Sequence, residues 1–199
     1  TVDPENRLLW KFPLRRLDAE ALRDAMLAVS GELDLRVGGA FVPTTHGEDG
    51  QVVIDEKHAG AFRRAMYLQQ RRTQPLTMLE VFDSPLIVAA CTRRGASTTP
   101  LQSLAMLNSA FARARARAFA QRVARETGTS AGDRVVLAFR MALGRGPSEA
   151  ERKLARELID AQTAFYAPAG ASSAGALGET ALADFCQMIF AANAFLYVD

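Results

Sequence analysis

The sequence has few of the residues, and none of the patterns, that mark the common catalytic and cofactor-binding sites. Its two cysteines, Cys91 and Cys186, and its two histidines fit no metal-site spacing and no haem-attachment motif. It also has no Gly-x-Ser-x-Gly elbow, no phosphate-binding loop and no dinucleotide fingerprint. We therefore expect no metal and no cofactor. The cysteines are expected to be unpaired, with a disulfide in an oxidising compartment as the alternative.

Long apolar runs and a strong net charge are also missing. No stretch is long enough to cross a bilayer, and no signal peptide is visible, so we expect no membrane insertion by this segment. The formal net charge is only +2, although there are 24 basic residues, of which Lys11, Lys57 and Lys153 alone are lysines. This balance argues against nucleic-acid binding. Any anion recognition should be local and made by arginine.

What the sequence does contain is enough apolar residues for a folded core. Of its 199 residues, 49% are hydrophobic and 23% are charged, which is typical of a globular protein. We expect one domain over residues 1–199. Because the sequence opens at Thr1 without an initiator methionine, we expect it to be a piece of a longer protein.

The spacing of apolar residues predicts a mainly α fold, a helical bundle with a small antiparallel β element and long loops. We expect Trp10 and Phe12 to pin the entry segment onto the domain. A first helix is expected between Asp18 and Gly31. Two short β candidates follow, at 51–54 and 63–71, which we expect to pair as an antiparallel ribbon.

The second half of the chain is predicted to be helical. Thr99 and Pro100 mark the start of a long helix that should end near Gly128. The arginines of its second half are expected on a solvated surface, with Arg113 and Arg117 on one face and Arg115 opposite. Further helices are expected at 133–143, 148–165 and 182–195. Two apolar faces are predicted to be buried. On the long helix the face is Leu101, Leu104 and Leu107. On the helix expected at 148–165 it is Ala150, Leu154, Leu158, Ala161 and Phe165.

Several stretches, in order along the chain, resemble one known family. They are residues 16–24, 63–67, 79–83, 91–111, 142–147 and 193–199. Together they are similar to the planctomycete-type C-terminal domain known as domain of unknown function 1553. One departure is visible near the end, where the family usually has Asn-Glu-Phe and this chain has Asn193, Ala194 and Phe195.

The resemblance implies context more than chemistry, and it supplies no catalytic residues. It implies the C-terminal part of a large exported protein, periplasmic or extracellular, that often also holds a companion domain and a cytochrome-c-like domain. Our leading interpretation is a non-catalytic interaction or structural module that docks against other domains of the parent protein. The alternative is a polysaccharide-binding or polysaccharide-degrading domain. A third hypothesis is a docking surface for the cytochrome-c-like domain. Whether the chain is an enzyme stays open.

Arginines near the expected ribbon and the central loop form one candidate site, for an anion or an acidic polysaccharide. Guanidinium groups bind carboxylate or sulfate through paired hydrogen bonds. The candidate ligand-binding residues are Arg63, Arg64, Tyr67, Arg71, Arg72, Arg93 and Arg94. Glu80 and Asp83 are candidate acid–base residues beside them. The alternative interpretation is a set of internal salt bridges from these arginines to Glu80 and Asp83.

Two other groups of polar residues are weaker candidates. His46 lies in a loop with several carboxylates and can do acid–base chemistry, although a solvated loop is the favoured alternative. Ser97, Thr98 and Thr99 stand before a helix start, where free N–H groups can bind an anion. Simple capping of the helix also explains these hydroxyl groups.

Overall fold

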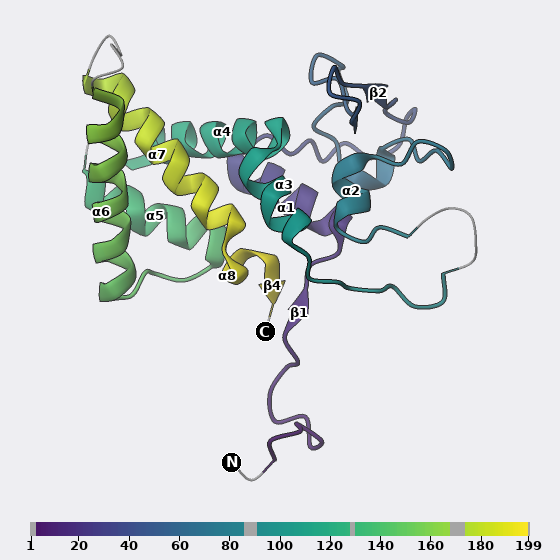
Figure 1. Ribbon diagram of the computed structural model, residues 1–199, viewed down its shortest axis with the longest axis horizontal. Coiled ribbons are helices and arrows are strands. Elements are labelled where there is room, and N and C mark those ends of the chain that lie inside the picture. Colours follow the sequence, from purple (N-terminus) through teal and green to yellow (C-terminus); the bar gives the residue numbers. More distant parts are fainter. Residues whose placement is uncertain (1–2, 86–90, 128–129, 168–173, 199) are drawn as a thin grey trace.

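The computed structural model describes residues 3–85, 91–127, 130–167 and 174–198 (Figure 1). Within these residues it is mainly α-helical with small antiparallel β elements, as the sequence predicts. The elements in chain order are β1 (Arg15–Arg16), α1 (Ala19–Ser30), β2 (Thr45–His46), β3 (Val52–Val53), the 3₁₀ helix η1 (Ala65–Tyr67), α2 (Thr77–Val81), α3 (Pro100–Asn108), α4 (Ala110–Thr127), α5 (Ala131–Leu143), α6 (Glu149–Tyr166), α7 (Ala174–Ala191), α8 (Asn193–Leu196) and β4 (Tyr197–Val198). None of the described helices is long and apolar enough to cross a bilayer.

Helices α4 and α7 pack against each other at the centre of the bundle, and the other helices surround them (Figure 1). Phe119 of α4 and Phe190 of α7 are fully buried and stack with their ring centroids 5.5 Å apart. The ring centroid of Phe195, in α8, lies 4.9 Å from that of Phe190. Burying such a side chain contributes about 2–3 kcal/mol, so this aromatic cluster anchors the core.

Most helix ends lie where the sequence predicts them. The last predicted helix, 182–195, is an exception, because α7 already begins at Ala174 and the extended backbone of Ala192 separates it from α8. Gly31 and Gly144 follow α1 and α5 with φ angles of 81° and 67°, in the left-handed region that glycine adopts without strain. At the start of α3 the Thr99 N–H donates to Gln102 Oε1 at 3.3 Å. Ser148 caps α6 in the predicted capping box. These ends depend on neighbouring residues in the sequence, and the predictions for them are confirmed.

The single long helix predicted for the middle of the chain is wrong, because it breaks at Ser109 into α3 and α4. Ser109 has an extended backbone, with ψ at 140°, and its Oγ accepts a hydrogen bond from the Ala112 N–H at 3.2 Å. Gln187 of α7 donates to the carbonyls of Met106 and Leu107, at 3.0 and 2.7 Å. A side chain from another helix therefore satisfies carbonyls that the break leaves without helical partners.

The break also changes which face of α3 is buried. Gln102 and Met106 face the core. Leu101, Leu104 and Leu107, which the sequence predicts to be buried, are 58%, 51% and 51% exposed. Helix α3 therefore presents an outward apolar face, which we call the α3 leucine face.

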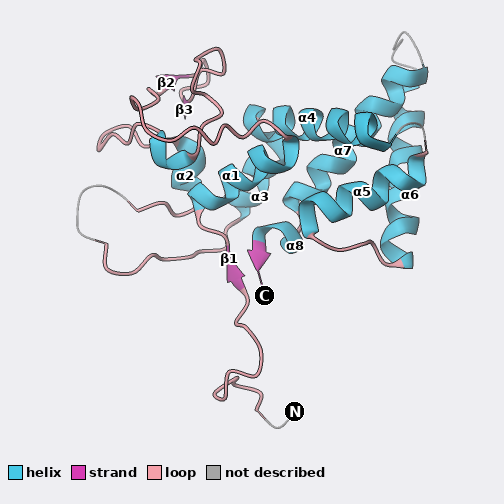
Figure 2. Cartoon of the chain, turned by 180° about the vertical axis from the view of Figure 1, so that it is seen from behind, coloured by secondary structure: helices cyan, strands magenta, loops and turns pink. Residues whose placement is uncertain are grey.

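Two further predictions of burial are also wrong. On α6 the core side carries Ala155, whereas Leu154 and Phe165 of the predicted apolar face are exposed. Trp10 and Phe12 do not pin the entry segment, and they are 60% and 61% exposed. Residues 3–14 extend from β1 away from the helices (Figures 1 and 2), and we call them the N-terminal arm.

Two small antiparallel sheets join parts of the chain. β1 pairs with β4, with Arg16 opposite Tyr197, so the segment just before α1 meets the last described residues of the chain. β2 pairs with β3, so the strand predicted at 51–54 is present. Its predicted partner at 63–71 is wrong, because that segment holds η1 and pairs with the loop before β2 only through isolated bridges.

Candidate functional site

The seven residues of the candidate anion site do not meet in one place. Arg63 is buried and donates to the backbone carbonyls of Ala40 at 3.0 Å, Arg36 at 3.3 Å and Gly38. Its guanidinium lies 3.8 Å from the ring centroid of Tyr67, whose hydroxyl accepts from the Gly38 N–H at 3.0 Å. These two residues hold the loop that follows α1 against η1.

Two other arginines of the set form ion pairs with α1. Arg64 Nε lies 3.6 Å from Asp24 Oδ2, and Arg94 Nη1 lies 2.6 Å from Glu20 Oε2. Burial raises the pKa of Glu20, but the hydrogen bonds and charge of Arg94 outweigh it, so the pKa lies below its ordinary value. Both pairs are partly exposed, and such pairs contribute little stability.

Only Arg71, Arg72 and Glu80 of the candidate set line a common cavity. Its volume is about 10 Å³, which is room for about one water molecule. The side chains of Arg72 and Arg93 form no hydrogen bond or ion pair with any residue that the structure describes, although the Arg93 carbonyl accepts from Cys91 Sγ at 3.3 Å. The described chain therefore provides no cradle of several converging arginines, and their binding role stays a prediction.

The candidate histidine is exposed on the β2–β3 hairpin. His46 stands opposite Val52 in this small sheet. Within residues 3–85, 91–127, 130–167 and 174–198, no three His, Cys, Asp or Glu side chains lie close enough to hold a metal ion. An acid–base role for His46 stays a prediction.

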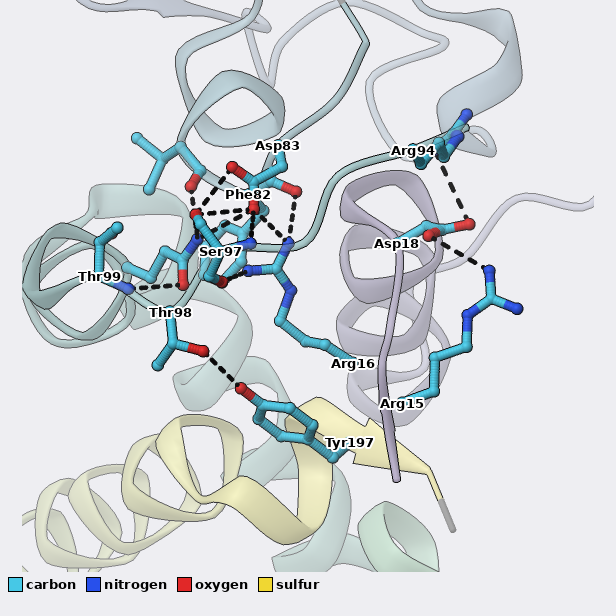
Figure 3. Close-up of polar contacts among 12 residues, drawn as sticks. Arg15, Arg16, Asp18, Phe82, Asp83, Arg94, Ser97, Thr98, Thr99 and Tyr197 are labelled. Carbon is cyan, nitrogen blue, oxygen red and sulfur yellow. Dashed lines mark hydrogen bonds and ion pairs between the residues drawn. The ribbon is translucent and has the colours of Figure 1, made fainter. Parts of the chain in front are cut away.

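Asp83, the last candidate acid–base residue, lies at the centre of a polar network, shown in Figure 3. Its Oδ2 is 2.7 Å from Arg16 Nη2 and accepts from the Ser97 N–H at 2.7 Å. The Ser97 hydroxyl donates to its Oδ1 at 2.9 Å. Gln102 donates to Ser97 Oγ at 3.2 Å and to the carbonyl of Val81 at 3.0 Å. We call Arg16, Asp83, Ser97 and Gln102 the Asp83 junction.

The junction fixes both the charge and the position of Asp83. The Arg16 side chain is only 5% exposed, and it also donates to the carbonyl of Phe82 at 3.0 Å. Burial raises the pKa of Asp83, but hydrogen bonds from Ser97 and Arg16 outweigh it, so the pKa lies below its ordinary value. The residue has a φ of 63°, in the left-handed region that Asp tolerates better than most residues. Asp83 is therefore an anchored carboxylate that joins β1, α2 and α3.

The hydroxyl groups before α3 are also engaged within the fold. Thr98 Oγ1 lies 3.1 Å from the Tyr197 hydroxyl, which links the start of α3 to β4 (Figure 3). Sequence reasoning missed Arg16 and Tyr197 as partners in this region. Both lie in stretches that carry the family resemblance, so those stretches held the available signal.

The arginine repeat of α4 is only partly solvated. Arg113 and Arg117 are exposed, as predicted, but Arg115 is buried, so the prediction for it is wrong. Its Nε lies 2.9 Å from Glu32 Oε2 and its Nη2 lies 3.2 Å from Glu56 Oε2. These two carboxylates, both far away in the sequence, make burial of the charge tolerable.

Arg23 of α1 is also buried, and both Arg23 and Arg115 lie near the ring of Phe111. Its guanidinium lies 5.5 Å from the centroid of Phe111, and that of Arg115 lies 5.1 Å from it. Arg23 donates to the carbonyls of Ala61 at 2.7 Å and Arg63 at 2.9 Å. Burial lowers the pKa of Arg23 to about 10, so it stays charged at neutral pH. It ties the loop before η1 to α1.

A pocket of about 570 Å³ opens beside these two arginines. It lies between the β2–β3 hairpin, α2 and the break between α3 and α4. Apolar side chains form its walls, among them Val53, Ile54, Met78, Val81, Ala105 and Phe111. Its charged lining residues are Arg23, Glu48, Asp49, Glu56, Arg113 and Arg115. Its size is typical of a binding site. Of the candidate groups, only carboxylates of the loop that holds His46 line it, namely Glu48, Asp49 and Glu56.

The comparison with known families matches residues 1–159 to PSD1, a protein of unknown function (DUF1553). No curated protein and no solved structure matches the chain. The matched stretch includes the Asp83 junction and the residues that line the pocket. Because the match spans most of the sequence, the chain belongs to the PSD1 (DUF1553) family.

Proposed function

We propose that this chain is a non-catalytic interaction module that docks against other domains of a larger exported protein. The α3 leucine face carries the proposal. Leu101, Leu104 and Leu107 follow one another at three-residue intervals, so they share one side of α3, and each is more than half exposed. Because about half of each side chain is still exposed, covering it completely with a partner domain gains about 0.8–1.5 kcal/mol.

The face is held rigidly, which favours docking. The Thr99–Gln102 capping box fixes the start of α3, and Gln187 binds the carbonyls at its end. A surface that is ordered before binding loses less conformational entropy when a partner covers it. The three leucines are therefore presented as a preformed apolar strip.

The polar candidates support the same conclusion. Asp83 is held by Arg16 and Ser97, and Arg63 is held by backbone carbonyls. Side chains bound in this way hold loops against helices, and such a role needs no substrate. The exported location and the companion domains follow from the usual context of the family, and the cytochrome-c-like domain is one of the partners to test.

The proposal is tested with the Leu104→Glu variant. The rest of the parent protein is expressed separately, and its affinity for the domain is measured by titration calorimetry. We expect Leu104→Glu to weaken binding at least about tenfold, a loss of about 1.4 kcal/mol, because a charge replaces a buried leucine. Its melting temperature should stay unchanged, because Leu104 touches solvent in the free domain.

Leu154→Glu on α6 is the matched control, because Leu154 is a leucine outside the α3 leucine face that is also more than half exposed. It should leave the affinity unchanged. Absence of binding by the unaltered domain, or equal affinity of the Leu104→Glu variant, would overturn the proposal.

A further inference from the structure

The N-terminal arm is an apolar segment that nothing in the described structure covers. Its large apolar side chains are between 60% and 80% exposed, namely Leu8, Leu9, Trp10, Phe12 and Leu14. Its side-chain hydrogen bonds stay within the arm, as in the 3.0 Å bond from Trp10 Nε1 to the carbonyl of Asp3. Leu9 has a φ of 52°, a conformation that costs a leucine about 1–2 kcal/mol. The arm therefore loses little when it gives up this turn for a docked, extended form.

The pocket beside Phe111 has the matching chemistry. Its walls are apolar, while its buried guanidinium groups are already paired with carboxylates or carbonyls. Glu48 and Asp49 at its edge are exposed and form no ion pair with a described residue. The arm carries two basic residues, Arg7 before its apolar residues and Lys11 between Trp10 and Phe12. Apolar groups and opposite charges thus occur on both surfaces, which favours their association.

The direction of the arm favours a pocket on a second molecule. Pairing of β1 with β4 sends the arm away from α2 and from the β2–β3 hairpin that border the pocket (Figures 1 and 2). Two copies that exchange arms make the same contact twice, which gives a closed dimer with two-fold symmetry.

The available area is sufficient for such a dimer. Trp10 and Phe12, at their present exposure, can bury about 100–150 Å² each. Four aromatic side chains and the pocket walls that they cover then remove about 800–1,200 Å² from solvent, and the arm leucines add to this. That total approaches the lower end of specific protein interfaces.

We infer that the N-terminal arm of one copy docks in the 570 Å³ pocket of a second copy, with Trp10 and Phe12 against the apolar walls and Lys11 near Glu48. This goes beyond the proposed function, because it names another surface and another partner.

Trp10 is the sole tryptophan of the chain, so intrinsic fluorescence reports directly on the arm. The unaltered protein is diluted in steps, and its emission maximum is compared with its mass from sedimentation equilibrium. We expect the emission to shift to shorter wavelength with the same concentration midpoint as dimer formation. A protein that stays monomeric at every concentration, or a dimer unaffected by deletion of residues 3–14, overturns the inference.

Exchange of charges separates docking between copies from docking within one chain. Lys11→Glu and Glu48→Lys should each raise the dimer dissociation constant about tenfold, because like charges then meet. An equimolar mixture of the two variants should regain the dissociation constant of the unaltered protein, since a mixed dimer pairs opposite charges at both contacts. If only the variant that carries both Lys11→Glu and Glu48→Lys regained the contact, and its Trp10 emission did not depend on concentration, the arm would dock within its own chain. That result would overturn the inference.

Two controls separate this test from that of the proposed function. Glu179→Lys makes the same charge change at an exposed position of α7 and should leave the dimer unchanged. Leu104→Glu should also leave the dimer unchanged. Glu48→Lys, in turn, should leave the affinity for the companion domains unchanged.

Discussion

Replacement of Asp83 by asparagine should destabilise the protein strongly, because it leaves a buried guanidinium without its counter-charge. The Arg16 side chain is 5% exposed and its partner Asp83 is 28% exposed. Loss of one partner from a buried ion pair costs about 3–5 kcal/mol. We expect the free energy of unfolding to fall by about 2–4 kcal/mol, somewhat less than this range, because Asp83 is partly exposed and the amide oxygen of asparagine can still accept a hydrogen bond. Asparagine also tolerates a positive φ, so backbone strain does not contribute.

The change is measured by urea unfolding at neutral pH, followed by circular dichroism. For a chain of this length, each kcal/mol corresponds to about 2–4 °C in melting temperature. Asp83→Asn should therefore also lower the melting temperature by about 4–16 °C. Arg94→Gln is the matched control, since it breaks the more exposed pair with Glu20, and we expect it to cost about 1 kcal/mol or less.

The reasoning is refuted if Asp83→Asn costs no more than Arg94→Gln. In that case the Asp83 junction would be a set of surface contacts, and the position of α3 would depend on apolar packing alone. A double-mutant cycle with Arg16→Met adds a second check, because two groups in direct contact should show a coupling energy of at least about 1 kcal/mol.

Three further predictions follow from local chemistry. The hydrogen bonds from Arg145 lower the pKa of Glu151 to about 2. The stability that ionised Glu151 adds is therefore full above about pH 4.5 and is lost as the pH falls toward 2. Glu151→Gln should lower the free energy of unfolding by about 1 kcal/mol at pH 7, and the stability of the variant should depend less on pH between 4.5 and 2. A thiol reagent should label Cys91 and spare Cys186, because burial raises the pKa of the Cys186 thiol; labelling of both in the folded protein would contradict this. Acidic oligosaccharides should leave the melting temperature unchanged, whereas a rise of about 5–10 °C that Arg71→Ala abolishes would support the polysaccharide alternative.

Helix ends are the part of this fold that sequence reasoning predicts best, because the signals lie within a few residues of each other. Gly31 and Gly144 follow their helices, and Ser148 with Glu151 forms the capping box of α6. The break at Ser109 has only one local signal, the serine hydroxyl that accepts from the Ala112 N–H. It depends on Gln187, which is far away in the sequence and reaches the carbonyls at the end of α3.

Burial was predicted less well, because apolar spacing marks a face without saying what covers it. The leucines of α3 and Leu154 of α6 have the spacing of buried stripes, yet Met106 and Ala155 face the core, while Leu158 of the predicted α6 face is half-buried against it. Periodicity is the same for a face that meets the core and for one that awaits a partner. An exposed apolar stripe is therefore informative only once the packing is known.

The candidate site shows the same limit for charged residues. Sequence reasoning identified Arg63, Arg94 and Asp83 as residues of interest, and all three form specific contacts. Their partners are backbone carbonyls and side chains from distant segments, which spacing does not reveal. Arg115 illustrates this best, since it lies in a repeat with Arg113 and only the fold distinguishes the buried residue from the exposed one.

The most direct test of the docking role is hydrogen–deuterium exchange of α3, measured in the isolated chain and in the full-length parent protein. Docking through the α3 leucine face should slow exchange of the amides of residues 101–108 by about tenfold or more in the parent protein, since a covering partner suppresses local opening. Unchanged exchange across α3, with protection appearing on other surfaces, would contradict the assignment of Leu101, Leu104 and Leu107 as the docking surface.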